Sequence, residues 1–465
     1  MSLSRSFVLF VAVLAIGHQA TSGRASDWPQ FRGDTGTGVG PAGPLPDKWD
    51  LKTNLQWQVK LPGPGSSSPI ILGSRVYVTC YSGYGANSQN PGEKKNLVRH
   101  LVCLERKDGK IVWTADIKSD TPEANFGGMM TQHGYASNSP ATDGKRIYVF
   151  LGTAGVHAFD LQGKPVWKRA LGTGTDQWGS ASSVRLYGDL VIINAAIESS
   201  RVVGLNKETG DEVWSFKVPR RSWSTPTLIE VAGGKHELVI NAEGRISGLD
   251  PQSGKELWHC DGVNDYTCPS VIPGQGIAYV SGGRQSSIIA VRCGGTGDVT
   301  QTHVIWKRGQ VGANVPTPVL YKGHLFGVKD RGGIAYCVNA ETGEVVFQQR
   351  LSAEEPQARP VAFQPPEGQR GGGRGGRRGG MGGRGGPGGG GGVQFYASTV
   401  AADDKIFAVS RSSGVFVLSA KPAFELVATN QFADDLTTFD ATPAISDGQL
   451  FIRSNGSLYC VALPK

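Results

Sequence analysis

Aromatic and polar residues recur just before the first strand of successive repeat units, where they could bind a ligand together. Aromatic rings offer contact area to a flat ligand or a peptide, and neighbouring polar groups orient it. These residues are His133, Tyr135, Gln177, Trp178, Arg221, Trp223, Asp265, Tyr266, Asn314, Tyr396, Phe439 and Asp440. A second interpretation is structural: Trp178, Trp223 and Tyr266 pack on one another and close the narrow end of a channel.

The seven cysteines do not indicate metal or redox chemistry, because their spacing matches no ligand or redox motif. Three of them fall at a repeat position that otherwise holds glycine or alanine, and we expect buried thiols acting as small apolar groups. These three are Cys103, Cys337 and Cys460. The other four follow no such rule, and two of them could form a disulfide in an exported protein. They are Cys80, Cys260, Cys268 and Cys293.

The elements that position the candidate residues are hairpins of a repeated motif. In its clearest copy, residues 246–258, an apolar strand reaches Leu249 and Asp250, a turn contains Gly254, and a second strand ends on Trp258. Other copies lie at residues 101–113, 156–167, 202–214 and 334–347, and a copy at 288–306 is lengthened by an insertion. Each copy follows another pair of short strands. Four strands in each unit of about 40 to 50 residues predict one blade of a β-propeller.

Eight units can be counted from the residues that introduce the first strand of each. These are Ser68, Ser139, Ser182, Thr225, Cys268, Thr317, Ala397 and Thr442. The last unit has three strands and lacks the tryptophan strand, whereas residues 55–59 form a tryptophan strand with no blade before it. We therefore predict that this N-terminal strand completes the last blade and leaves no open sheet edge. The predicted fold is all-β, an eight-bladed propeller of four-stranded antiparallel blades over residues 53–465.

Residues 1–25 are expected to be a signal peptide. Arg5 precedes an apolar run from residue 7 to residue 16, which is too short to span a bilayer, and small residues follow it. No cysteine near the cleavage zone could carry a lipid. We expect a soluble protein exported to the periplasm or the extracellular space, without a transmembrane segment. Residues 26–52 are expected to wrap irregularly around the outside of the propeller.

The net charge of +8 does not indicate a nucleic-acid partner. Seven arginines lie in the signal peptide or in a glycine-rich tract, and the remaining chain carries a charge of about +1. The tract, residues 369–392, has low complexity and is expected to form a disordered loop. It is similar to the RGG segments of RNA-binding proteins, but export argues against RNA and favours loose contact with anionic surface polymers.

Three long insertions are predicted to lie on one face of the propeller. They occupy residues 81–96, 116–134 and 351–392, either between the second and third strands of a blade or between blades. Binding sites are usually built from variable loops on a rigid scaffold, so this face is the predicted working surface. Tolerated growth of surface loops is the alternative.

The motif Leu-Asp-x-x-x-Gly-x-x-x-Trp at residues 249–258 resembles the PQQ-type propeller repeat. The resemblance extends from about residue 55 to the C-terminus and implies that a tryptophan packs between neighbouring blades at Trp57, Trp113, Trp167, Trp214, Trp258 and Trp306. One branch of this family contains quinoprotein alcohol dehydrogenases, which hold pyrroloquinoline quinone (PQQ) and calcium in the channel mouth. Another contains the non-catalytic outer-membrane assembly propeller. Residues 27–33 and 134–140 are similar to exported PQQ-repeat proteins of planctomycete-type bacteria.

No residue motif supports the dehydrogenase branch. Many of those enzymes hold the quinone with a vicinal disulfide, and this chain has no adjacent cysteines. Asp265, Asp440, Asn138 and Asn314 could supply calcium ligands or a base, but no motif fixes them, and no catalytic residue is assigned.

We therefore expect a monomeric, non-catalytic scaffold that binds envelope proteins or a small ligand, with no cofactor and no metal. A PQQ- and Ca²⁺-dependent dehydrogenase is the alternative. A glycan-binding propeller is the third interpretation.

Overall fold

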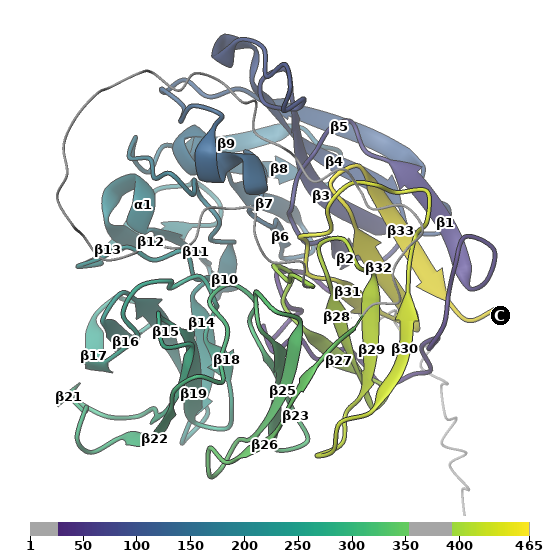
Figure 1. Ribbon diagram of the computed structural model, residues 1–465. Coiled ribbons are helices and arrows are strands. Elements are labelled where there is room, and N and C mark those ends of the chain that lie inside the picture. The colour runs from purple at the N-terminus through teal and green to yellow at the C-terminus, as the bar shows by residue number, and fades with distance from the viewer. Residues whose placement is uncertain (1–26, 353–392, 465) are drawn as a thin grey trace, which may run out of the picture.

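Eight antiparallel sheets surround a central axis in the computed structural model, which describes residues 27–352 and 393–464 (Figure 1). The all-β, eight-bladed propeller predicted from the repeats is confirmed. The helical elements among the described residues are short: η1 (Lys94–Asn96), η2 (Gly128–Gln132), η3 (Gly152–Ala154) and α1 (Ala196–Ser199). The predicted signal peptide and glycine-rich tract lie outside the described residues.

The blades follow one another along the chain, and each runs from the axis outward. Blade one contains β2 (Ile70–Leu72), β3 (Arg75–Ser82), β4 (Val98–Glu105) and β5 (Ile111–Ile117). Blade two contains β6 (Ala141–Thr142), β7 (Arg146–Phe150), β8 (Val156–Asp160) and β9 (Pro165–Arg169). Blade three contains β10 (Arg185–Tyr187), β11 (Leu190–Ala195), β12 (Arg201–Asn206) and β13 (Glu212–Lys217). Blade four contains β14 (Thr227–Val231), β15 (Lys235–Ala242), β16 (Arg245–Leu249), β17 (Glu256–Asp261) and, as a fifth strand, β21 (Gly297–Asp298).

The remaining blades have four strands each. Blade five contains β18 (Ile272–Pro273), β19 (Ile277–Gly282), β20 (Ser287–Arg292) and β22 (Val304–Arg308). Blade six contains β23 (Val319–Tyr321), β24 (His324–Val328), β25 (Ile334–Asn339) and β26 (Val345–Arg350). Blade seven contains β27 (Val400–Ala402), β28 (Lys405–Val409), β29 (Val415–Ser419) and β30 (Leu426–Asn430). Blade eight contains β31 (Ala444–Ser446), β32 (Gln449–Arg453), β33 (Ser457–Ala462) and β1 (Leu55–Lys60).

The N-terminal strand closes the ring. β1 pairs antiparallel with β33, so that Leu55 lies opposite Val461 and Lys60 lies opposite Ser457. Figure 1 shows these two strands, purple and yellow, side by side. The predicted closure of the last blade by the N-terminal strand is confirmed.

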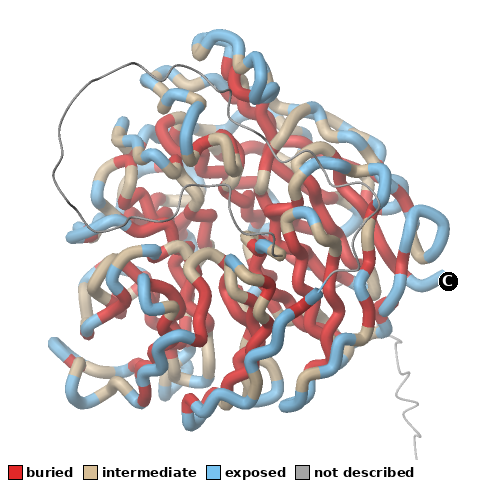
Figure 2. The backbone as a smooth tube through the Cα atoms, viewed as in Figure 1, coloured by how far each residue is buried: buried red, intermediate tan, exposed pale blue. Residues whose placement is uncertain are grey.

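The core lies between the blades, because each blade packs against two neighbours. The second and third strands are buried on both faces: all six residues of β11 are buried (Figure 2). Outer strands alternate instead, and in β13 only Trp214 is fully buried. This difference explains why the inner repeat positions form continuous Val, Ile and Leu runs.

Tryptophans of the outer strands pack on the glycine turn of the next blade. The Nε1 atoms of four of them donate to a carbonyl oxygen of that turn: Trp57 to Arg106 (2.9 Å), Trp113 to Leu161 (3.1 Å), Trp167 to Lys207 (2.8 Å) and Trp306 to Ala340 (3.0 Å). A Cβ atom on Gly109, whose φ is +72°, would lie 2.6 Å from the Trp57 ring. The turn therefore requires glycine for its backbone conformation and for the close approach of the indole.

The cysteines that share the small-residue position lie beneath these rings. Cys103 is opposite Trp113 and Cys460 is opposite Trp57, as Gly204 is opposite Trp214. All seven cysteines are unpaired, and no disulfide joins the four whose state the sequence left open. Burial raises the pKa of Cys103 to about 11, as expected for a thiol that serves as a small apolar group.

Blade four departs from the repeat. The insertion in blade five forms β21, which pairs parallel with the outer strand β17 and covers its edge. The Nε1 atom of Trp258 donates to Glu237 Oε2 at 2.6 Å, inside its own blade, and the Gly294 amide donates to the same oxygen at 3.1 Å. One buried carboxylate thus replaces the glycine turn as the partner of this indole.

Residues 27–54 lie against the face opposite the predicted insertions. The sequence predicts a wrap around the outside of the propeller, but the first part of this segment is buried beside the innermost strands. The Arg32 side chain donates to the carbonyl oxygens of Thr317, Pro318 and Thr399 in blades six and seven. Burial lowers the pKa of Arg32 to about 9, with a further lowering from Arg185. Arg32 therefore helps to fill this end of the channel.

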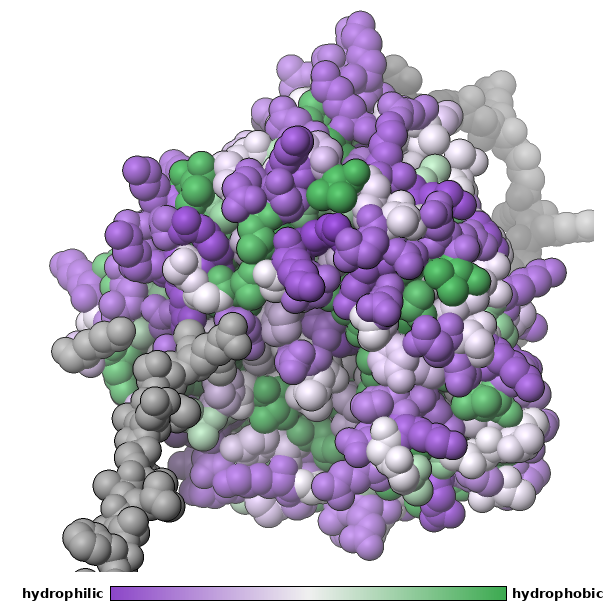
Figure 3. All heavy atoms as spheres, turned by 180° about the vertical axis from the view of Figure 1, so that it is seen from behind, coloured by the Kyte–Doolittle hydropathy of each residue, from purple (hydrophilic) through white to green (hydrophobic). Residues whose placement is uncertain are grey.

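Apolar residues on the surface are scattered. Figure 3 shows a largely hydrophilic face on which hydrophobic residues form small, separate groups. Several exposed apolar residues precede the outer-strand aromatic residue, among them Val112, Val166, Val213, Ile305 and Val346. Single exposed apolar residues are normal on protein surfaces and do not by themselves mark a binding site. No helix in the described part of the chain is long and apolar enough to span a bilayer.

Candidate functional site

The candidate site is the channel mouth, which we define as the residues that precede the first strand of each blade on the face of the links at residues 83–97 and 118–140. Most of the residues predicted from the sequence lie there. They form local groups, each tied to a different part of the ring.

The first group joins Tyr396 and Asp440 through Arg411. Arg411 Nε donates to Asp440 Oδ1 at 2.7 Å, and its guanidinium carbon lies 4.1 Å from the centre of the Tyr396 ring. Both side chains of the ion pair are shielded, with 11% of Arg411 and 2% of Asp440 exposed. Arg411 was not among the residues predicted from the sequence, because it lies in a turn of blade seven that no repeat position marks.

The link between blades one and two covers the mouth. Arg411 Nη1 donates to Gln132 Oε1 at 2.9 Å, and Nη2 donates to the Gln132 carbonyl at 3.2 Å. Met130 in the same link is buried, and a Cβ on Gly179 at the start of blade three would lie 2.6 Å from its sulfur. The insertion predicted at residues 116–134 therefore touches both blade seven and blade three, and it narrows the opening of the channel.

His133 follows this covering segment. Its Nδ1 atom shares a 2.7 Å hydrogen bond with Ser137 Oγ. Burial lowers the pKa of His133, although the Trp178 backbone and the Asp440 charge oppose that effect. The imidazole ring is therefore neutral at pH 7. It lies near Asp440 of the first group and near the Trp178 backbone, and it acts there as a hydrogen-bonding residue.

The second group contains Trp178, Arg221 and Trp223. Trp223 is 9% exposed and donates from Nε1 to the Gly179 carbonyl at 2.9 Å. The Arg221 guanidinium lies 5.8 Å from the Trp223 ring centre and pairs with Asp176 at 3.3 Å. Trp178 is only half-buried. Trp223 thus closes part of the channel wall, whereas Arg221 and Trp178 can meet a ligand.

Asp265 and Tyr266 form a further part of the mouth, in which Tyr266 is exposed. Both have left-handed backbone conformations, with φ of +63° and +48°. This conformation is costly for a residue as bulky as tyrosine, and such strain is concentrated at binding and catalytic sites. Asp265 forms an ion pair with Arg284, and the Tyr266 side chain is 43% exposed. The loop therefore exposes the Tyr266 ring, and the ion pair between Asp265 and Arg284 holds its backbone in place.

Asn314 and Tyr135 lie apart from these groups. The Asn314 amide donates to Asp330 Oδ1 at 3.1 Å in blade six, and its buried Oδ1 atom has no hydrogen-bond partner among the described residues. The Tyr135 ring packs edge-on against Tyr81 in a cluster on blade one. Tyr135 therefore supports the covering link and does not line the mouth.

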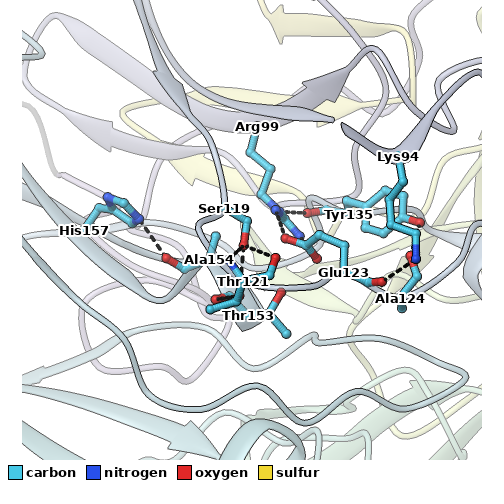
Figure 4. A network of polar contacts seen from close by, with 10 residues as sticks. All are labelled: Lys94, Arg99, Ser119, Thr121, Glu123, Ala124, Tyr135, Thr153, Ala154 and His157. Carbon is cyan, nitrogen blue, oxygen red and sulfur yellow. Dashed lines mark hydrogen bonds and ion pairs between the residues drawn. The ribbon is translucent and has the colours of Figure 1, made fainter. Parts of the chain in front are cut away.

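A buried ion pair anchors that link (Figure 4). Arg99 donates from Nη1 and Nη2 to the two oxygens of Glu123 at 2.6 and 2.8 Å, and from Nε to the Tyr135 carbonyl at 3.0 Å. The two charged side chains are 4% and 9% exposed. A bidentate pair in this environment fixes the position of both groups.

Next to this pair lies a small cavity of about 30 Å³ between blades one, two and three. Arg99, Glu123, Ser180 and Glu198 contribute to its wall. Burial raises the pKa of Glu198 to about 7. The volume suits one or two water molecules and is far too small for an organic cofactor.

The residues of the mouth do not fit PQQ with a calcium ion. Asp440, Asp265 and Asp176 each form an ion pair with an arginine, so their oxygens face guanidinium groups. Within residues 27–352 and 393–464, no three His, Cys, Asp or Glu side chains converge as metal ligands would. Trp223 is held against Gly179, and η2 covers the opening that a stacked quinone would need.

Comparisons with known proteins agree with the fold. A family model described as outer membrane protein assembly factor BamB matches residues 99–349. The BamB protein of Escherichia coli (strain K12) is 27% identical over 176 residues, which are 36% of this chain and 41% of that protein. The chain thus matches less than half the length of this relative.

Two solved structures have the same fold. The crystal structure of BamB from Moraxella catarrhalis has a TM-score of 0.54 at 12% identity and covers 87% of this chain and 98% of its own. A europium-containing methanol dehydrogenase has a TM-score of 0.61 at 10% identity and covers 94% and 98%. At these identities the similarity shows the architecture alone. Because the family model spans more than half of the sequence, the chain belongs to the BamB-like family of PQQ-repeat β-propellers.

Proposed function

We propose that this protein is a binding and assembly scaffold of the cell envelope, and that it holds envelope proteins at the face that carries the covering link. The family match supports this role, because the relatives are described as outer membrane protein assembly factors. We propose the periplasm or the extracellular space as its location, following the leader-like N-terminus and the named relatives.

The observation that carries the proposal is the construction of the channel mouth. Its carboxylates form ion pairs with arginines, its histidine is uncharged at pH 7, and its exposed groups include the Tyr266 ring and the guanidinium of Arg221. Aromatic rings and arginines are the residues enriched where proteins bind one another. Among residues 27–352 and 393–464, no cluster of side chains that could hold the calcium ion of a quinone site is found there.

A photo-crosslinking amino acid at position 266 tests the proposal. Expressed in cells with an intact envelope, this variant should form adducts with envelope proteins. The same amino acid at Val213, which is exposed on the outer strand of blade three, is the matched control and should form few adducts. Equal adducts from both positions would contradict a specific binding face.

A second assay addresses the dehydrogenase alternative. Purified protein supplied with PQQ and Ca²⁺ should not reduce an electron-accepting dye with simple alcohols. Dye reduction that depends on both additions would overturn the scaffold assignment. Binding to a sugar array, without protein adducts, would favour the glycan-binding interpretation.

A further inference from the structure

Three side chains of blade one form a hydrogen-bonded chain of the serine, histidine and aspartate type. Ser82 Oγ lies 2.8 Å from His100 Nε2, and His100 Nδ1 lies 2.7 Å from Asp116 Oδ1. The carboxylate accepts from Nδ1–H, which leaves the Nε2 lone pair facing the serine hydroxyl. This is the order of contacts that activates a serine nucleophile: the base holds the hydroxyl proton and the acid orients the base.

The strands place these residues in register. Ser82 ends β3, His100 lies in β4 and Asp116 lies in β5, and His100 is directly opposite Asp116. Side chains two residues apart on a strand point to the same face, so Ser82 lies on the face of Cys80, and His100 lies on the face of Val102 and Leu104. Cys80, Val102 and Leu104 belong to the core that blade one shares with blade eight. Ser82 and His100 therefore lie on the face of blade one that packs against blade eight. The chain of contacts therefore lies at one end of the interface between blades one and eight.

Exposure varies along this chain of contacts, and the Asp116 carboxylate is its most exposed member, at 65%. The His100 side chain is 10% exposed, while Ser82 is half-buried and the following Gly83 is exposed. A shielded base beside an accessible hydroxyl is the arrangement that a hydrolytic site requires, because the substrate must reach the serine without displacing the imidazole.

Gly83 also provides a candidate oxyanion donor. Its φ is +81°, and a Cβ on it would lie 1.8 Å from the Asn96 carbonyl oxygen, so only glycine fits. Among the backbone hydrogen bonds outside the strands of the described residues, none is donated by the Gly83 amide. The amide that follows a nucleophilic serine is a usual oxyanion donor in hydrolases.

Another serine and histidine pair in the chain lacks this arrangement. Ser137 Oγ bonds His133 through Nδ1, and the other influences on that ring include the Trp178 backbone but no carboxylate in hydrogen-bond contact. Ser137 therefore serves as an internal control for a hydroxyl that merely contacts a histidine.

We propose that Ser82, His100 and Asp116 form a hydrolytic site for carboxylic esters, separate from the channel mouth and additional to the scaffold role. Ser82 Oγ bonds to the ester carbonyl carbon while its proton passes to His100 Nε2. The carbon–oxygen bond to the alcohol then breaks, and His100 returns the proton to the departing alkoxide. Water, deprotonated by His100, hydrolyses the acyl-serine and regenerates the free hydroxyl. Asp116 is a positioning residue that holds the imidazole.

The test is covalent labelling of the full-length protein with a fluorophosphonate, in which the serine oxygen bonds to phosphorus as fluoride leaves. Peptide mass spectrometry should find the label on Ser82. The Ser82→Ala variant should lose it, whereas Ser137→Ala should be labelled as fast as the unmodified protein. His100→Gln should slow labelling and p-nitrophenyl acetate hydrolysis at least about 100-fold, and Asp116→Asn at least about tenfold.

Thermal midpoints of all variants separate loss of the site from loss of the fold. If Ser82 is not labelled in the unmodified, folded protein, the proposal is wrong, whatever the variants show. Equal labelling rates with and without the His100 imidazole in folded proteins would also overturn it, because the contacts would then be only cross-strand hydrogen bonds of the sheet.

Discussion

The indole of Trp258 and the carboxylate of Glu237 are joined by a 2.6 Å hydrogen bond inside blade four. Four other repeat tryptophans donate to a carbonyl oxygen of the next blade instead. The difference arises because the copy in blade five is interrupted by the insertion that forms β21, so that no regular glycine turn meets Trp258. Glu237 also accepts from the Gly294 amide, which ties the insertion to the blade that it extends.

Removing this carboxylate should destabilise the ring. Glu237→Ala leaves two N–H donors without an acceptor, one of them on a fully buried indole, and we expect a loss of about 2 kcal/mol. Glu237→Gln keeps an acceptor oxygen and should lose about half as much. Urea unfolding followed by circular dichroism measures both. A Glu237→Ala variant as stable as the unmodified protein would show that water replaces the carboxylate.

The glycine of the repeat turn should tolerate no side chain where an indole covers it. In Gly109→Ala, the new methyl group meets the Trp57 ring at 2.6 Å and also occupies a left-handed backbone at φ +72°. Gly73→Ala is the matched control, because its φ is +53° and nothing lies within 4 Å of the added carbon. The control should lose about 1 kcal/mol from backbone strain. Gly109→Ala should lose at least about 1 kcal/mol more, seen as a lower thermal midpoint.

The sequence predicts the ring of blades well because most blades repeat the same local sequence motif. An alternating strand, a glycine turn and a tryptophan recur in order, and the unmatched strands at the two chain ends complete one another as β1 and β33. The contacts that shape the mouth carry no such signal. Arg411 and Gln132 are 279 residues apart and belong to irregular segments, so no periodicity relates them.

The strand β21 and the position of Arg32 could not be predicted from the sequence, each for a physical reason. β21 has only two residues, and its parallel pairing with β17 depends on the position of the whole insertion. Arg32 belongs to a segment without strand or helix periodicity, yet its guanidinium reaches three carbonyl oxygens inside the channel. The place of the candidate residues in the repeat puts most of them at the start of a blade on one face, but it does not predict the partners of each.

Stability should fall as the pH rises from 4.5 to 7, because of Glu198. Burial raises the pKa of this carboxyl from 4.5 to about 7, so the folded protein holds a proton that the unfolded chain has released. The advantage is complete below pH 4.5 and is lost as the pH passes 7. Glu198→Gln should therefore be about 3 kcal/mol more stable than the unmodified protein at pH 8 and similar at pH 4.5. Unfolding curves at the two pH values measure this, and an equal difference at both would contradict it.

Substitutions of Trp223 and of Tyr266 should show which residues form the channel wall and which form the binding surface. Trp223 is 9% exposed and donates to the Gly179 carbonyl, so Trp223→Ala should lose about 3 kcal/mol of stability. Tyr266 is 43% exposed, and Tyr266→Ala should leave the thermal midpoint nearly unchanged while weakening adduct formation with envelope proteins from a crosslinking amino acid at Trp178. The reverse result is a Trp223→Ala variant that is stable but forms no adducts and a Tyr266→Ala variant that forms them normally. This result would place the binding surface on the channel wall. Adducts unaffected by either substitution would exclude the mouth as the binding surface.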